Sequence, residues 1–259
     1  MKADVTRQWV NILALLAVIF VNYLATSLPL AGRDTGEISD MFPVLFTPAP
    51  YVFAIWGLIY LLLIVFVVYQ ALPGQRDNPR LRRVGYLFAL SCALNIAWLF
   101  AWHYLLIGLS LVIMLGLLAT LIALYERLEI GRDAVSGIAW VATSLPFSIY
   151  LGWITIATAA NISITLFDAG WAGWGVSDAA WTVMVIAFAM AIGLAMLVRR
   201  GDVPFNLVVM WALIGIAVAR WDIQLIAVTA LAAAILLGVA VTYRLWSRHS
   251  AGGRPVPQR

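Results

Sequence analysis

The chain has 259 residues, of which 64% are hydrophobic and only 11% charged, with a formal net charge of +4. A soluble domain carries roughly a quarter charged residues, so the composition excludes an ordinary soluble protein. Backbone groups in lipid must be paired internally, and the apolar runs are continuous rather than alternating. The sequence therefore predicts membrane-spanning helices and not a barrel. The basic residues lie in short loops beside apolar runs, so we expect no nucleic acid partner.

Eight apolar runs follow one another along the chain. A helix of about 20 residues, rising about 1.5 Å per residue, crosses a hydrocarbon core of about 30 Å. The seventh run is shorter than this, which leaves seven or eight spans. The runs cover residues 9–28, 51–71, 84–103, 105–125, 138–166, 179–198, 204–219 and 223–245.

The basic residues predict an orientation. Of the 16 Lys and Arg residues, all except Arg33 and Arg220 fall in the two terminal segments or in loops that eight spans place on the same side. Because such loops stay in the cytoplasm, we expect a multi-pass protein of an inner or plasma membrane with both termini cytoplasmic. The loop at 29–50 then lies outside. Its length is typical of a lid or binding loop, although a solvated connector is the alternative.

The second run begins sharply and carries an aromatic face. Pro48 and Pro50 cannot donate backbone hydrogen bonds, but they suit the first turn of a helix. Trp56 and Tyr60 lie one turn apart and therefore on the same face. We place the candidate site on this face, beneath the loop at 29–50.

Polar and aromatic residues of four runs fall at a similar depth. Counting from the outer ends places Asn22, Trp56, Asn95, Trp98 and Asn161 in one layer of the outer half, with Trp153 about two turns deeper than Asn161. Flat aromatic walls with a few amides suit a large planar apolar ligand. The alternative is that the amides join neighbouring helices and the indoles pack in the core. Both interpretations stay open at this point.

Residues that carry other chemistries are absent from the sequence or isolated in it. No Asp, Glu, Lys or Arg lies at mid-membrane by this assignment, which disfavours an ion pump or proton relay. No Ser/His/Asp set indicates hydrolysis, and Cys92 and the two histidines lack metal-site spacing. His103, expected with Trp102 at the rim of the bundle, is an alternative haem ligand. A lone histidine in such a place more often makes a hydrogen bond.

Three motifs in chain order resemble the tryptophan-rich sensory proteins, the family that includes the mitochondrial translocator protein. Pro48, Trp56 and Tyr60 match P-x7-W-x3-Y, and Asn95 and Trp98 match L-N-x-x-W. The fifth run matches Y-x-x-W-x-x-x-A-T-x-x-N at Tyr150, Trp153, Ala157, Thr158 and Asn161. The resemblance covers residues 9–167 and implies a five-helix bundle with a long first loop over a pocket for porphyrins, haem and related hydrophobic ligands. It also implies a homo-oligomer as one candidate assembly.

We therefore expect an all-α integral membrane protein with a five-helix translocator-like core at 1–167, including the loop at 29–50. Residues 168–259 are expected to form further transmembrane helices and a cytoplasmic tail. The expected partners are the lipid bilayer and a hydrophobic small molecule, a porphyrin or haem, with no cofactor required. The expected ligand-binding residues are Trp56, Trp98 and Trp153 as stacking groups, Asn95 and Asn161 as hydrogen-bonding groups, and Tyr60, Pro48 and Asn22.

Competing functions make different predictions. A porphyrin receptor binds its ligand saturably, whereas a small-molecule transporter moves it across vesicles. A scaffold or assembly factor for a pigment-containing complex co-purifies with partner subunits. The resemblance also implies one enzyme hypothesis, light-dependent porphyrin breakdown, in which Trp56 and Trp153 would take part.

Overall fold

The computed structural model describes residues 2–27 and 30–252, and within these ranges the regular structure is entirely helical. Short 3-10 turns connect several of the helices, and one of them, η2 (Pro50–Ala54), leads directly into α3. The α-helices are α1 (Lys2–Ser27), α2 (Thr35–Asp40), α3 (Ile55–Ala71), α4 (Pro79–Val84), α5 (Leu87–His103), α6 (Ile107–Arg127), α7 (Gly137–Thr143), α8 (Leu145–Asp168), α9 (Asp178–Arg200), α10 (Val203–Ala219) and α11 (Gln224–Gly252).

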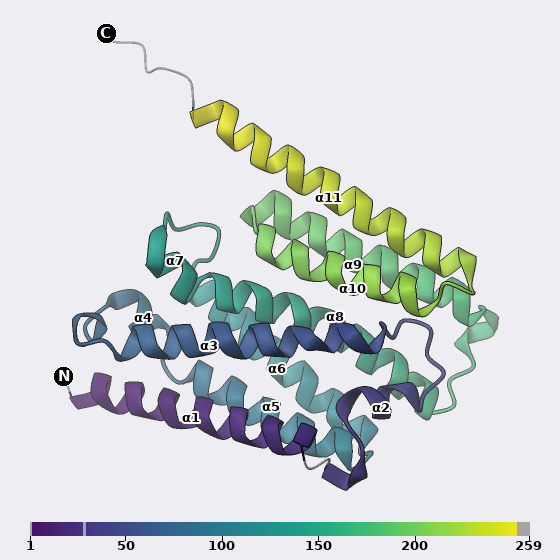
Figure 1. Cartoon of the computed structure of the whole chain (residues 1–259), viewed down its shortest axis with the longest axis horizontal. Coiled ribbons are helices and arrows are strands. Elements are labelled where there is room, and N and C mark those ends of the chain that lie inside the picture. The colour runs from purple at the N-terminus through teal and green to yellow at the C-terminus, as the bar shows by residue number, and fades with distance from the viewer. Residues whose placement is uncertain (1, 28–29, 253–259) are drawn as a thin grey trace.

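Each of the eight apolar runs forms a long helix or, in the case of α7 and α8, two helices in succession. In the described residues six of these segments are long and apolar enough to cross a membrane, while α5 and α10 are apolar but shorter. The protein is thus a multi-pass α-helical membrane protein, as predicted. Figure 1 shows the long helices side by side, with the start of α1 and the end of α11 at one end of the bundle. We call this the termini end, and the end that carries α2 the loop end.

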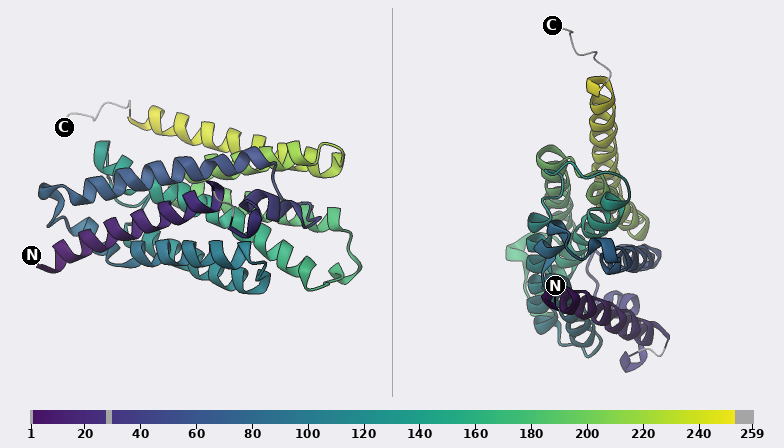
Figure 2. Two further views of the ribbon diagram at one scale, coloured as in Figure 1. Left: turned by 60° about the horizontal axis from the view of Figure 1, so that its bottom comes forward. Right: turned by 90° about the vertical axis from the view of Figure 1, so that its left-hand side faces the viewer.

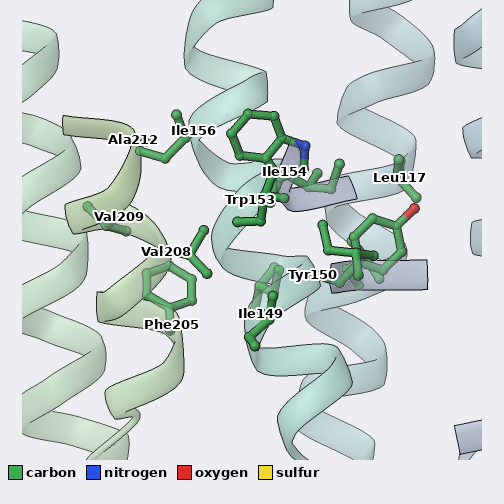
Figure 3. Close-up of a cluster of buried hydrophobic side chains, with 14 of the residues drawn as sticks. Leu117, Ile149, Tyr150, Trp153, Ile154, Ile156, Phe205, Val208, Val209 and Ala212 are labelled. Carbon is green, nitrogen blue, oxygen red and sulfur yellow. The ribbon is translucent and has the colours of Figure 1, made fainter. Parts of the chain in front are cut away.

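The helices α9, α10 and α11 pack together, and α10 joins them to the rest of the bundle through α8 (Figure 1). Gly152 makes this contact close, because a Cβ there would lie 3.1 Å from the Val208 Cβ and 3.2 Å from the Phe205 carbonyl oxygen. Small residues at such crossings let helix backbones approach in lipid, where burial itself supplies no hydrophobic gain. Figure 3 shows Phe205 and Val208 of α10 on one side of α8 and the Tyr150 ring on its other side.

The loop between α1 and α3 is held at both of its ends. Asp34 and Glu37 form a capping box that starts α2, and the Trp102 indole donates to the Thr35 carbonyl oxygen at 3.2 Å. Further along, the Arg220 guanidinium donates to the Val44 carbonyl oxygen at 2.9 Å. The loop therefore contacts α5 through α2 and the end of α10 through its second half.

Two more contacts tie the approach to α3 onto α10. The Ala49 N–H donates to the Gly215 carbonyl oxygen at 3.1 Å, and the Trp211 indole donates to the Val52 carbonyl oxygen at 3.1 Å. A Cβ at Gly215 would collide with the Val52 side chain, so only glycine permits this approach. The helix α10 thus contacts the segment that leads into α3 directly, at the loop that closes over the candidate site.

Charged residues concentrate at the termini end. Arg80 pairs with Asp133 at 3.2 Å, and Arg82 pairs with Asp4 at 2.8 Å. Partial burial of Arg80 lowers its pKa, and the nearby Asp133 opposes that shift. Each pair has one largely buried partner, Arg80 in the first and Asp4 in the second, and each joins segments that are distant in the sequence.

Candidate functional site

The expected aromatic face of α3 is formed as a stacked pair. The Trp56 and Tyr60 ring centroids lie 5.6 Å apart with an interplanar angle of 17°. Trp56 also meets the edges of Tyr150 and Trp153 of α8, with centroid distances of 6.0 Å and 6.2 Å. Offset-stacked and edge-to-face contacts of this kind stabilise aromatic clusters. Residues that are about 90 positions apart in the sequence thus form one aromatic wall.

A second stacked pair comes from α5. The Trp98 and Trp102 centroids lie 5.6 Å apart at 20°, and the Trp98 indole donates to the Asn161 Oδ1 at 3.1 Å. The Asn161 Nδ2 also lies 3.1 Å from the Ser110 hydroxyl of α6. Asn161 therefore links α5, α6 and α8. Trp102 and His103 lie in the last turn of α5, at the end of the bundle where they were expected, and both are buried, with 3% and 2% exposure.

Asn22 and Asn95 belong to a separate hydrogen-bonded chain. The Asn22 Nδ2 donates to the Asn95 Oδ1 at 3.0 Å, and the Asn95 Nδ2 donates to the Tyr150 hydroxyl oxygen at 3.1 Å. Asn95 is fully buried. This chain joins α1, α5 and α8 and matches the helix-joining alternative for the amides, although Asn22 also faces a cavity described below.

The site residues divide between two neighbouring cavities rather than one pocket. The first is a small space of about 40 Å³, and the residues that line it include Pro48, Trp56, Trp98, Trp153 and Asn161. The second is a cavity of about 570 Å³ between α1, α2, α3 and α5. Among its lining residues are Asn22, Phe53, Trp56, Tyr60 and Trp98. Asn95 is among the lining residues of neither cavity.

Volume decides which cavity can hold a ligand. Small-molecule sites measure about 300–1,000 Å³, so the larger cavity is of suitable size, whereas the smaller one has room for little more than a water molecule. Trp56 and Trp98 line both cavities, as does Phe53, whose ring centroid lies 5.8 Å from that of Trp153. The sequence reasoning missed Phe53. Its position one turn before Trp56, on the same helical face, is the signal that would have found it.

Among the described residues that line the two cavities, the Trp153 indole N–H and the Tyr60 hydroxyl are buried polar groups without a hydrogen bond of normal geometry. Buried polar groups are nearly always paired in folded proteins, and leaving one unpaired costs about 1–3 kcal/mol. Trp153 borders the small cavity and Tyr60 the large one. Both atoms are fully covered by the protein, so these polar groups lie behind the cavity walls.

The mouth of the larger cavity is acidic. Asp34, Glu37 and Asp40 line it, and no salt bridge among the described residues involves any of the three. In the described ranges no group of three or more His, Cys, Asp or Glu residues could hold a metal ion. His103 contacts the Leu99 carbonyl oxygen through Nδ1 at 2.8 Å and is among the lining residues of neither cavity.

Together these features define a polytopic, all-α membrane protein whose aromatic side chains enclose cavities among its spanning helices. The chain belongs to the TSPO-like protein family, because the model of that family matches residues 8–243. The match continues past the five-helix core through α9 and α10 and into α11. No curated protein and no solved structure matches the chain.

Proposed function

We propose that the protein binds a planar, largely apolar ligand of the porphyrin class in the cavity of about 570 Å³ beneath α2. The observation that carries this proposal is the stacked Trp56–Tyr60 pair on the cavity wall. Rigid aromatic rings offer a flat apolar area at low cost in conformational entropy, which suits a planar ligand.

The carboxylates at the mouth of the cavity determine which charge is favoured at the edge of the ligand. Two like charges about 7 Å apart in water repel by about 0.6 kcal/mol. The propionates of protoporphyrin IX at this mouth would each meet two or three such carboxylates, among them Glu37 and Asp40. The dimethyl ester has the same ring and no ionised edge. We therefore propose that a neutral or cationic edge is preferred, by at least tenfold in affinity at low salt, which corresponds to at least about 1.4 kcal/mol.

Tryptophan fluorescence of the purified protein in detergent, titrated with protoporphyrin IX and with its dimethyl ester, tests both points. Saturable quenching is expected for both ligands, with the tighter binding for the ester. Trp56→Ala should weaken binding at least tenfold, whereas Trp246→Ala, which removes an exposed indole near the end of α11, should leave it unchanged. Linear quenching shared by the protein and both variants would mean partition into the micelle and would refute the site.

The charge argument has its own control. The pair of substitutions Glu37→Gln and Asp40→Asn removes two charges from the mouth while leaving the aromatic wall intact. Binding of the free acid should tighten in this variant, and the preference for the ester should shrink. An unchanged preference for the ester would show that the difference arises from the ligand's partition alone.

A further inference from the structure

A further cavity of about 940 Å³ lies on the other side of α3 from the aromatic site. Its walls come from α3, α8, α10 and the loops at 130–135 and 200–204, and Leu245 of α11 borders it. Figure 2 shows α11 projecting from the rest of the bundle toward the termini end. Ala54, Ile55 and Leu58 line this cavity, which we call the α10 groove. Phe53 and Trp56, which belong to the same helical turn, line the aromatic cavity on the opposite side.

The α10 groove is polar at one end and apolar at the other. At the termini end it is lined by Asp133, Arg200 and Asp202, and farther along by Leu58, Leu207 and Trp211. The nine-residue rise from Asp202 to Trp211 spans about 14 Å of helix. This is about half of a hydrocarbon core of about 30 Å. The groove therefore has the polarity and the length of a single lipid leaflet.

The charges at the polar end are already paired within the protein. The Tyr125 and Ser148 hydroxyls each donate to the Asp202 carboxylate at 2.8 Å, and Arg200 pairs with Glu126. Asp133, which Arg80 engages, is paired as well. Among the described residues that line the polar end, the cation Arg200 is thus already paired, so this end offers hydroxyl dipoles and charge pairs rather than a vacant cation for a head group of net negative charge.

We propose that the α10 groove binds one acyl chain of a zwitterionic glycerophospholipid, with the head group at the paired charges of the termini end. Half-exposed Leu58 and Leu207 would contact the chain. In this groove the carboxylates of Asp133 and Asp202 are engaged by side chains of the protein, whereas those at the mouth of the aromatic cavity form no salt bridge among the described residues.

Photolabelling of the full chain in phosphatidylcholine liposomes tests the proposal. A trace of phosphatidylcholine carries a diazirine at the end of one acyl chain, and labelled peptides are mapped by mass spectrometry after irradiation. Label should concentrate on residues 54–58 and 207–211. Leu207→Trp should lower this labelling at least fivefold, as should Ala54→Phe from the opposite wall. Leu109→Trp, at an equally exposed position of α6, should leave it unchanged.

Several outcomes would overturn the proposal. Labelling that follows lipid exposure over all helices would mean ordinary annular lipid. Stronger labelling by a phosphatidylglycerol probe would contradict the zwitterionic preference. A disulfide between two copies of the variant Leu207→Cys would make the groove an interface between copies. Trp56→Ala should keep the labelling pattern, so that failure of the porphyrin site and failure of this site are distinguishable.

Discussion

Removal of the Arg220 side chain should loosen the loop that covers the aromatic cavity. The half-buried guanidinium donates to the Val44 and Leu45 carbonyl oxygens at 2.9 Å and 3.3 Å. Hydrogen bonds to charged groups contribute about 1.5–3 kcal/mol each when buried. Partial exposure and the longer second bond reduce the sum to about 1–2 kcal/mol. Arg220→Met should therefore raise the open population of this loop segment roughly fivefold to thirtyfold.

Hydrogen–deuterium exchange with mass spectrometry measures this opening directly. The Ala49 amide, bonded to the Gly215 carbonyl oxygen, should exchange faster in Arg220→Met by about the same factor. Amides of α2 should change less, because the Trp102 indole holds that helix separately. Arg33→Met is the matched control, since Arg33 is exposed in the same loop. Unchanged exchange in Arg220→Met, or an equal increase in the control, would refute the anchoring role.

Two further substitutions test the packing around the site. Trp98→Phe keeps an aromatic ring but removes the indole N–H that donates to Asn161. Interhelical hydrogen bonds in membranes average about 0.6 kcal/mol. The melting temperature in detergent should therefore fall slightly. The same change at exposed Trp9 should have no effect, and equal melting of both variants would contradict the assigned bond. Gly152→Ala should destabilise the α8–α10 crossing by about 1–3 kcal/mol. Gly108→Ala, where a Cβ meets nothing within 4 Å, should not, and comparable losses would argue against close packing at Gly152.

The helical architecture was predictable because lipid imposes it. A chain in hydrocarbon must pair its backbone within each segment, so uninterrupted apolar runs translate directly into helices. Each predicted run lies on a long helix of the structure, and the short seventh run became the 17-residue α10. The motif that ends at Asn161 likewise pointed to the family to which the chain belongs.

The division of the site into two cavities was not predictable from depth alone. Counting residues along a helix gives a height in the membrane, but the direction in which a side chain points depends on how that helix is rotated against its neighbours. Asn95 and Trp98 share a depth, yet the amide bonds toward α1 and α8 while the indole lines both cavities. Loop structure was also invisible to periodicity, and so the burial of Trp102 at the end of α5, where its indole donates to the Thr35 carbonyl oxygen of α2, was not predicted.

A polar cluster at the termini end was missed for a different reason. Gln70 of α3 donates to the Gln8 carbonyl oxygen at 3.1 Å and accepts from the Asn11 amide at 3.0 Å. All three side chains are buried. Near the end of a span an amide costs little when exposed to head groups, so its presence alone does not indicate burial. The paired placement of amides at the matching ends of α1 and α3 is the signal that would have suggested this contact.

The turn formed by residues 53–58 separates the two large cavities, and this gives the protein a thermodynamic property that neither cavity has alone. Because this single turn of helix lines both cavities, a movement of the turn out of one cavity is a movement into the other. If a lipid in the α10 groove displaces Ile55 and Leu58, it also shifts Phe53 and Trp56, and by linkage each ligand would change the binding free energy of the other by the same amount. The lipid in which the protein is assayed would then be a variable of every affinity measured at the aromatic site. Bilayer composition would then act on the protein as an effector does, through a single turn of helix.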